Sequence, residues 1–205
     1  MLNRNPAMTP DTTSATPLKL DPRTTALVTI DLQQGILGLA KGPYDAATVL
    51  ANAGALMAAF RAARAAVVRV KVGFAPDFAD RLQQPCDAPN PVGALPADWM
   101  DDPRELPAQP GDIHVLKRQW GAFHGTDLDL QLRRRGIRTI VLGGISTPFG
   151  VESTARFAWE LGYEIVFAED LSSAALAEQH HHAFRHVFPR LGRTRTTAEI
   201  VAAIG

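Results

Sequence analysis

The sequence is poor in cysteine, in net charge and in long apolar runs, and each shortage excludes a class of protein. Its 205 residues include one cysteine, so no disulfide can form within the chain, which favours a reducing cytoplasm. Lys+Arg and Asp+Glu both number 21, and this balance gives no reason to expect nucleic acid or an anionic membrane as a partner. No apolar run approaches the roughly 20 residues of a membrane-spanning helix. We therefore expect a cytoplasmic protein that acts on a small molecule.

Several motifs of well-known sites are missing as well. There is no G-x-G-x-x-G or Walker sequence, so a nucleotide site is not indicated, and no G-x-S-x-G nucleophile elbow is present. His182 and His186 share a helix face, but no further ligands accompany them. Cys86 lies in a Pro-rich segment without a neighbouring base, which favours a surface or packing thiol. We expect neither a metal nor a cofactor.

The N-terminal residues differ in composition from the rest of the chain. They are rich in Thr, Pro and Asn and lack the apolar region of a signal peptide. This pattern predicts a mobile tail over residues 1–18 and one domain over residues 19–205, long enough for a sizeable core.

Strand and helix patterns alternate along the domain. Short apolar runs rich in β-branched residues predict strands over 25–31, 66–74, 112–117, 137–144 and 163–170, with a short edge strand over 192–197. Ala-rich or amphipathic stretches predict helices over 45–65, 126–136, 151–162, 173–188 and 198–204. This alternation predicts an α/β fold with a parallel sheet and helices on both of its faces.

Polar features follow three of the predicted strands. Asp31 ends the first strand, Lys117 ends the third, and the turn 143–150 follows the fourth. Ligands of such sheets bind at the carboxyl ends of the strands, so the three features converge if these strands are neighbours. Asp31 could instead be an exposed cap, and Lys117 a solvated residue at a strand end. The segment 75–111, rich in Pro, Asp and Gln, is long enough to be a functional cover or a binding loop.

Three stretches of the sequence resemble the isochorismatase-like hydrolase superfamily: "ALVTIDLQQGIL" (26–37), the block from Lys117 to Asp170, and "SSAALAEQHHHAFRHVFPRLGRTRT" (172–196). The resemblance runs from about residue 22 to the C-terminus. It implies a doubly wound, six-stranded parallel sheet in a Rossmann-like three-layer sandwich. It also implies a hydrolase that forms a homodimer or a larger homo-oligomer.

The resemblance further implies a catalytic triad of Asp, Lys and Cys at the strand ends. Asp31 and Lys117 match the first two members. The family cysteine lies in a G-x-x-T-x-x-C-V-x-x-T pattern, which here reads Gly144, Thr147, Gly150, Val151 and Thr154. Gly150 therefore occupies the cysteine position. Amidases of the superfamily need the thiolate to form an acyl-enzyme, and a glycine cannot form one.

True isochorismatases also resemble this chain in carrying glycine at that position. Their aspartate is thought to protonate a vinyl ether, after which water traps the oxocarbenium ion and the hemiketal collapses to pyruvate and an alcohol. We therefore expect a hydrolase for a small carboxylate-bearing substrate, with Asp31 as general acid. Two alternatives stay open: an amide or ureido hydrolase that has lost its cysteine, and a catalytically silent ligand-binding homologue.

The same resemblance suggests which residues contact the substrate. The turn amides around Ser146 and Gly150 form an oxyanion site in the family, and a cis peptide bond precedes the residue at Ser146. Burial would raise the pKa of Asp31 and the ammonium of Lys117 would lower it, and the sequence does not decide between them. The substrate-binding candidates are Gln33, Trp120, Phe123, His124, Ser146 and Thr147. For Phe123 a place in the core is equally plausible, and Ser146 or Thr147 could simply cap the next helix.

Overall fold

The computed structural model describes residues 17–89 and 93–205, and a parallel β-sheet lies at its centre. The sheet has six strands in the order β3-β2-β1-β4-β5-β6, and every adjacent pair is parallel. The strands are β1 (Thr25–Ile30), β2 (Ala66–Val72), β3 (Ile113–Lys117), β4 (Thr139–Gly144), β5 (Glu164–Ala168) and β6 (Arg193–Arg195). The predicted doubly wound sheet is confirmed, including its short edge strand.

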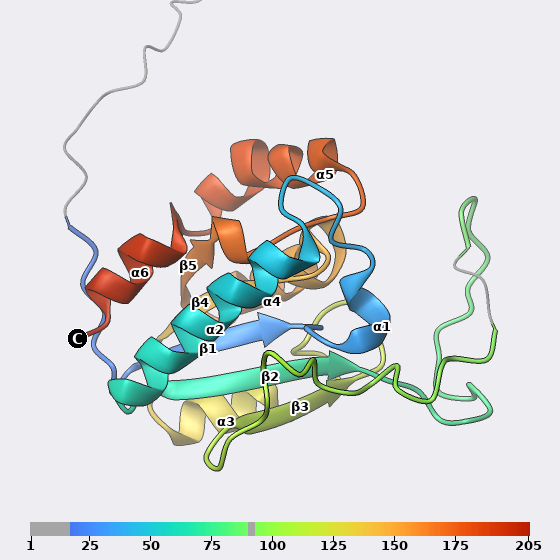
Figure 1. The fold of residues 1–205 in the computed structure, drawn as a ribbon, viewed down its shortest axis with the longest axis horizontal. Coiled ribbons are helices and arrows are strands. Elements are labelled where there is room, and N and C mark those ends of the chain that lie inside the picture. Colours follow the sequence, from blue (N-terminus) through green and yellow to red (C-terminus); the bar gives the residue numbers. More distant parts are fainter. Residues whose placement is uncertain (1–16, 90–92) are drawn as a thin grey trace, which may run out of the picture.

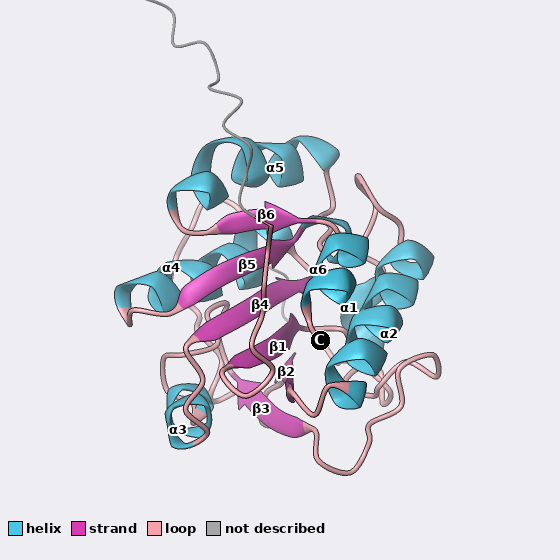
Figure 2. Cartoon of the chain, turned by 90° about the vertical axis from the view of Figure 1, so that its left-hand side faces the viewer, coloured by secondary structure: helices cyan, strands magenta, loops and turns pink. Residues whose placement is uncertain are grey.

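Helices cover both faces of the sheet (Figures 1 and 2). One face carries α2 (Ala46–Ala62) and α6 (Thr197–Ala203). The other carries α3 (Leu128–Arg134), α4 (Glu152–Glu160) and the turns that follow α5 (Ala177–His182). The remaining helical pieces are α1 (Gln34–Leu37), the π-helical turns η1 (Thr147–Val151) and η3 (Ala183–Val187), and the 3₁₀ turns η2 (Glu169–Leu171) and η4 (Phe188–Arg190).

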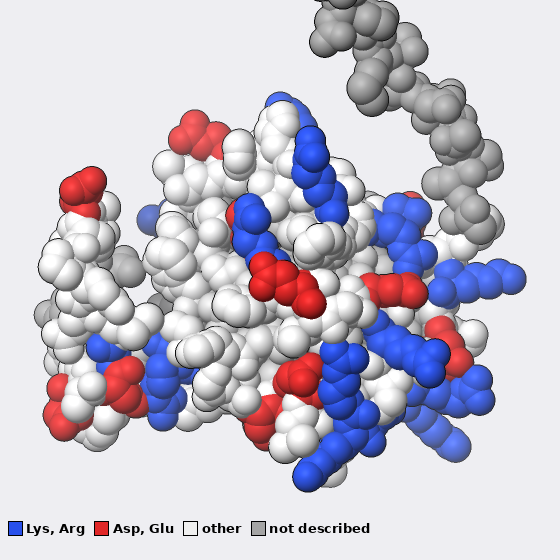
Figure 3. All heavy atoms as spheres, turned by 180° about the vertical axis from the view of Figure 1, so that it is seen from behind, with Lys and Arg blue, Asp and Glu red and all other residues white. Residues whose placement is uncertain are grey.

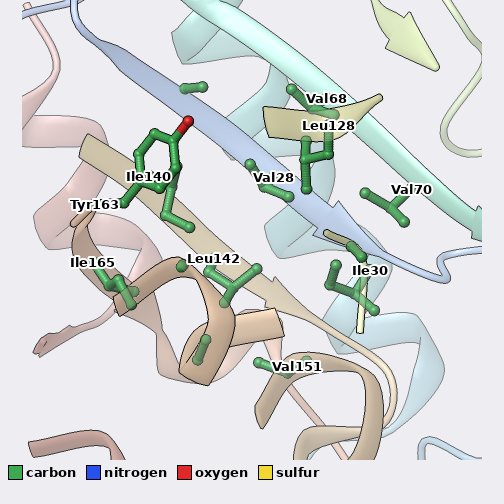
Figure 4. Close-up of a cluster of buried hydrophobic side chains, with 14 of the residues drawn as sticks. Val28, Ile30, Val68, Val70, Leu128, Ile140, Leu142, Val151, Tyr163 and Ile165 are labelled. Carbon is green, nitrogen blue, oxygen red and sulfur yellow. The ribbon is translucent and has the colours of Figure 1, made fainter. Parts of the chain in front are cut away.

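Each face of the sheet has its own apolar core. Successive side chains of a strand point to opposite faces, so Leu27 packs against α2 while Val28 and Ile30 pack with the α3 and α4 side. Figure 4 shows Ile30 beside Leu142 and Val151 in the core on the α3 and α4 side of the sheet. All six residues of β1 are buried, which explains why its sequence is a continuous apolar run. Each large apolar side chain buried in this way contributes about 1.5–3 kcal/mol to folding.

The strand order places a switch point beside β1. The chain runs from β1 to β2 and β3 on one side, and then returns to β4 on the other side of β1. The carboxyl ends of β1 and β4 therefore meet where such folds bind their ligands. The condition stated for convergence, that the first, third and fourth strands are neighbours, is met only for β1 and β4, because β2 lies between β1 and β3.

Two predicted helices have different boundaries in the structure. The helix predicted over 151–162 is preceded by the π-helical turn η1, which starts at Thr147. The helix predicted over 173–188 begins only at Ala177, because Ser173 and Ala174 form bridges to other segments. Its second half continues as η3 and η4. The short helix α1 directly after Asp31 was not predicted.

The first described residues of the chain lie against the α2 and α6 side of the sheet. Residues 1–16 of the predicted tail lie outside the described residues. Leu18 packs against the core of α2 and α6, and Leu20 pairs with Ile204. Leu18, the last residue of the predicted tail, thus contacts the core.

The long segment between β2 and β3 divides into two parts. Figure 1 shows it leaving the end of β2, extending away from the body and returning to β3. The described residues of 82–98 are almost all exposed. The returning part is fastened by a group of charged side chains that we call the Arg69 network: Arg61, Arg69, Lys71, Asp102 and Asp112. Arg69 is 3% exposed and donates to Asp102 Oδ1 and to the Leu106 carbonyl, both at 2.7 Å.

The surface carries charges of both signs. Figure 3 shows acidic and basic side chains on the same face, around an uncharged area. Among the described residues no helix is both long and apolar enough to cross a membrane.

Candidate functional site

Asp31 lies directly after β1 with its backbone in the left-handed region, at a φ of 53°. Its amide donates to the Val70 carbonyl at 2.9 Å, which holds the residue against β2. The residue is 5% exposed. Left-handed backbone is uncommon for residues other than glycine and concentrates at functional sites. The turn at Asp31 aims its carboxyl group across the end of the sheet.

Lys117 reaches Asp31 from the end of β3. Its Nζ lies 2.6 Å from Asp31 Oδ2 and also donates to the Gln119 carbonyl at 3.1 Å. Strands are spaced about 4.8 Å apart, so the side chains bridge about 10 Å over the end of β2. The length of the lysine side chain, rather than adjacency of the strands, brings the two residues together.

The two oxygens of the Asp31 carboxyl group have different surroundings. Oδ2 receives the ammonium of Lys117, whereas Oδ1 is buried and has no hydrogen-bond partner among residues 17–89 and 93–205. Burial raises the pKa of Asp31 to about 6, against the opposing charge and hydrogen bond of Lys117. The sequence left open whether burial or Lys117 has the larger effect on this pKa, and in the structure the effect of burial is the larger. A carboxyl group with this pKa exchanges its proton near neutral pH.

The turn after β4 is pressed against the end of β1. Gly144 has a φ of 137°, and a Cβ atom there would lie 2.2 Å from the Ile30 carbonyl oxygen, so this position needs glycine both for its backbone conformation and for its close approach to β1. A cis peptide bond joins Ile145 to Ser146, as the resemblance implied. The π-helical turn η1 follows, and such turns occur frequently at functional sites.

Gly150 faces Asp31 from this turn. A Cβ atom built on Gly150 would lie 3.3 Å from Asp31 Oδ2, 3.7 Å from the Trp120 carbonyl and 2.8 Å from Ile30 Cγ2. Asp31, Lys117 and Gly150 therefore meet in one place. The methyl group of Ile30 already takes part of the space that a side chain at position 150 would need.

The predicted pocket wall is only partly present at this place. Trp120 is 55% exposed, and its ring lies 4.9 Å from that of Phe149. His124 is exposed, and its carbonyl accepts a hydrogen bond from the Gln119 side chain. Phe123 is buried in the core against Tyr163, so the alternative of a core residue applies to it.

The other substrate-binding candidates differ in what their side chains do. The amide group of Gln33 is bonded to the backbone of Val72 and Trp99, so it ties the first strand end to the long segment. Thr147 Oγ1 is bonded to the Ser173 carbonyl and to His180. Ser146 precedes η1, but within the described chain its side chain makes no capping hydrogen bond.

Sequence reasoning missed three residues that contact the site or its turn. Thr154 Oγ1 donates to the Gly150 carbonyl at 2.7 Å and accepts from the Ala122 amide at 3.1 Å, although the family pattern contained this threonine. Ile30 adjoins Gly150 from the core side. His180 could have been found from its helical spacing with the apolar residues Phe184 and Phe188.

Other chemistry-bearing groups lie outside this constellation. Over residues 17–89 and 93–205 no three His, Cys, Asp or Glu side chains lie close enough to hold a metal ion. Cys86 is exposed in the long segment. An open hollow of about 390 Å³ lies beside η1, lined by Pro148, Glu152, Glu178, Gln179 and His182.

Comparisons with known proteins find relatives over most of the chain. The family model of the isochorismatase domain matches residues 25–199. The uncharacterized isochorismatase family protein YecD of Escherichia coli O157:H7 is 56% identical over 187 residues, covering 91% of this chain and 100% of that protein. The ureidoacrylate amidohydrolase RutB of Pantoea ananatis is 35% identical over 177 residues, covering 75% of this chain and 71% of that protein.

Solved structures show the same relationship. An isochorismatase family protein from Burkholderia thailandensis superimposes with a TM-score of 0.88 at 43% identity, covering 92% of this chain and 99% of that one. N-carbamoylsarcosine amidase from Thermoplasma acidophilum superimposes with a TM-score of 0.67 at 25% identity, covering 85% of this chain and 96% of that one.

Proposed function

Since this chain belongs to the isochorismatase family of hydrolases, we propose that it cleaves a vinyl ether in a small carboxylate-bearing substrate, with Asp31 as the proton donor. The observation that carries the proposal is the carboxyl group of Asp31, whose pKa burial raises to about 6 beside a turn with glycine at the position of the family cysteine. An ordinary aspartate would hold almost no proton near neutral pH. A group poised near the working pH is the efficient general acid.

The roles of the residues follow from their positions. Asp31 donates its proton to the enol ether carbon, and water adds to the resulting oxocarbenium ion. The hemiketal then collapses to a ketone and an alcohol, so the net change is the addition of one water molecule. Lys117, 2.6 Å from Asp31 Oδ2, stabilises the carboxylate that remains. Asp31 Oδ1 has no protein partner in the described part of the chain and is the oxygen free to present the proton.

Gly150 supports a route without a covalent intermediate. A thiol at this position would face Asp31, but its Cβ atom would stand 2.8 Å from Ile30 Cγ2. The site therefore does not simply hold an empty place for a cysteine. The backbone of the turn is left to approach the substrate or the attacking water.

Hydrolysis of a C–N bond is the second candidate, and the comparisons favour it. The relatives include ureidoacrylate amidohydrolase and N-carbamoylsarcosine amidase. Without a cysteine at position 150, water would attack the carbonyl group directly and the Asp31 carboxylate would accept its proton. This candidate uses the same residues, but Asp31 accepts a proton from water instead of donating one to the substrate.

Turnover of two substrates by the purified protein separates these candidates. We expect release of pyruvate from isochorismate and no ammonia or carbamate from ureidoacrylate. The reverse result would replace the first candidate by the second. Binding of both compounds in calorimetry without turnover of either would indicate the catalytically silent homologue.

We also propose that the protein is a cytoplasmic homodimer or larger homo-oligomer. Trp120, Phe149, Phe157 and Trp159 expose large aromatic surfaces, and the single cysteine suits a reducing compartment. Light scattering should give a multiple of 22.1 kDa. A monomer mass across a wide concentration range would contradict this proposal.

A further inference from the structure

His180 is a buried titratable residue that the proposed reaction does not use. It is fully buried, whereas its neighbours His181 and His182 are exposed. Its ring stacks on Phe184 with centroids 4.4 Å apart and meets the edge of Tyr44 at 5.9 Å. Histidine is seldom buried this completely unless its nitrogens have partners, so its contacts indicate its role.

One nitrogen of His180 bonds to the turn that carries Gly150. Its Nδ1 lies 3.0 Å from Thr147 Oγ1. The Thr147 amide and hydroxyl both donate to the Ser173 carbonyl, at 2.9 and 3.1 Å. Thr147 is the first residue of η1, so this contact fixes where the turn begins.

The hydrogen-bond partners assign the proton of the imidazole. Burial, and then the charge of His181, lowers the pKa of His180 to about 4, so the ring is neutral near pH 7 with a single N–H. The Ser173 carbonyl can only accept and takes the one hydroxyl hydrogen of Thr147, so Nδ1–H of His180 donates to Thr147 Oγ1. The other nitrogen, Nε2, is buried and has no partner within residues 17–89 and 93–205. Under the reverse assignment Nε2 would carry a buried, unpaired N–H, which is the rarer defect.

We infer that His180 is a positioning residue whose Nδ1–H holds Thr147, and through it the turn Thr147–Val151 that presents Gly150 to Asp31. The inference rests on the proposed function, because it makes His180 act through the placement of the site. Displacement of a reacting geometry by about 1 Å can cost 10²-fold in rate, even when the substituted residue is remote from the chemistry.

Two substitutions separate this role from simple core packing. His180→Phe keeps the aromatic stacking and removes both nitrogens, while His180→Asn keeps an N–H at the place of Nδ1 and removes the rest of the ring. If His180 only fills space, activity follows stability, so the Phe variant is active and the Asn variant impaired. Positioning predicts the reverse. The Phe variant should have the Tm and KM of the wild type, and its kcat should be lower by roughly 10- to 100-fold. The Asn variant should have a lower Tm and the kcat of the wild type.

Two further variants serve as controls. His181→Phe changes the exposed neighbour and should leave kcat, KM and Tm unchanged. Thr147→Val removes the acceptor of the same bond, so combining it with His180→Phe should lower kcat no further than Thr147→Val alone. A His180→Phe variant with the kcat of the wild type would overturn the inference.

A readout without substrate keeps the inference distinct from the proposed function. If the wild type turns over neither isochorismate nor ureidoacrylate, the proposed function fails. The position of the turn can still be read from hydrogen exchange of the Phe149 and Val151 amides, which both donate to the Ser146 carbonyl. We expect faster exchange in His180→Phe and unchanged exchange in His180→Asn. Equal exchange in all three proteins would show that His180 does not hold the turn.

Discussion

Two groups of buried or half-buried charges adjoin β2, the Arg69 network along the strand and the site at its carboxyl end, and they differ in how completely they are paired. In the Arg69 network, Asp112 receives two hydrogen bonds from Arg61 and one from the Gln109 amide, and Arg69 stands 3.6 Å away. At the site, Asp31 receives one lysine, and its Oδ1 is unpaired within the described residues.

The pKa values of the two groups move in opposite directions. Burial raises the pKa of Asp112 and of Asp102, but the hydrogen bonds from Arg61 and from Lys71 with Arg69 outweigh it, so both pKa values are lowered. Burial wins at Asp31, and its pKa is raised to about 6. The difference indicates that burial raises the pKa of a carboxyl group only where few donors oppose it.

Removing the carboxylate of the site should have the largest effect. Asp31→Asn leaves the shape of the residue and removes the proton donor, so we expect kcat/KM to fall by about 10²–10⁴-fold. Steady-state kinetics on the substrate that the wild type turns over, with circular dichroism to verify folding, measures this. Glu160→Gln, an exposed carboxylate on α4, is the matched control and should keep full activity. An active Asp31→Asn variant would show that the proton comes from elsewhere.

Breaking the Arg69 network should affect stability instead. Arg69→Met leaves the buried Leu106 carbonyl without its donor and Asp102 with Lys71 alone, so the free energy of unfolding should fall by about 1–3 kcal/mol. Urea denaturation measures the change. Arg156→Met breaks the exposed pair with Glu152 and should cost less than about 0.5 kcal/mol. If folded Arg69→Met lost its activity but kept its stability, the Arg69 network would act on the site and not on stability.

Installing a thiol tests the space between the two strand ends. Gly150→Cys brings a Cβ atom to 2.8 Å from Ile30 Cγ2, and such overpacking costs about 1–3 kcal/mol. Ile30→Leu lacks the branched methyl group and should relieve part of this cost in the double variant, whereas Ile30→Val keeps the methyl and should not. Under the vinyl ether proposal the thiol also lowers isochorismate turnover. Equal stability of both double variants would show that Ile30 does not restrict position 150.

The pH dependence of the reaction should give the smallest effect, but its direction tells whether Asp31 donates or accepts the proton. If Asp31 donates a proton, kcat/KM falls up to tenfold per pH unit as pH rises above the pKa of about 6. If Asp31 accepts a proton from water, kcat/KM instead falls as pH drops below 6. Lys117→Met removes the charge that opposes burial, so it should move this limb to higher pH. If the pH at which kcat/KM begins to fall is the same in Lys117→Met as in the wild type, the titrating group is not Asp31.

Most of the sheet could be predicted because central parallel strands are buried on both faces and read as apolar runs. Each of the five main predicted strands lies within two residues of its observed bounds at both ends. Helix starts were harder, since bridges such as Ser173 with Ile145 delay α5 and depend on contacts between distant segments. The order of the strands was not visible in the sequence, which is why the convergence of the site residues could be stated only on the condition that their strands are neighbours.

The meeting of Asp31, Lys117 and Gly150 at the strand ends could be predicted, but the contacts of the residues around them could not. Asp31 and Lys117 stand out as charges after apolar runs, and a resemblance led to Gly150. The roles of Gln33 and Thr147 depend on which backbone atoms lie opposite them, and no local pattern encodes that. Ile30 reads as one more core residue until the turn after β4 is placed against it.

The reach of Lys117 across β2 also bears on how the protein folds. The pair that it forms with Asp31 closes a loop of 86 residues, and it requires β2 to be in place between the two strands. Contacts between residues so far apart in the sequence form slowly, because the entropy cost of closing the loop comes before the contact can stabilise the chain. A partly folded chain with β3 undocked therefore holds an aspartate without its lysine. The Asp31–Lys117 pair and this half of the sheet are therefore completed in the same step.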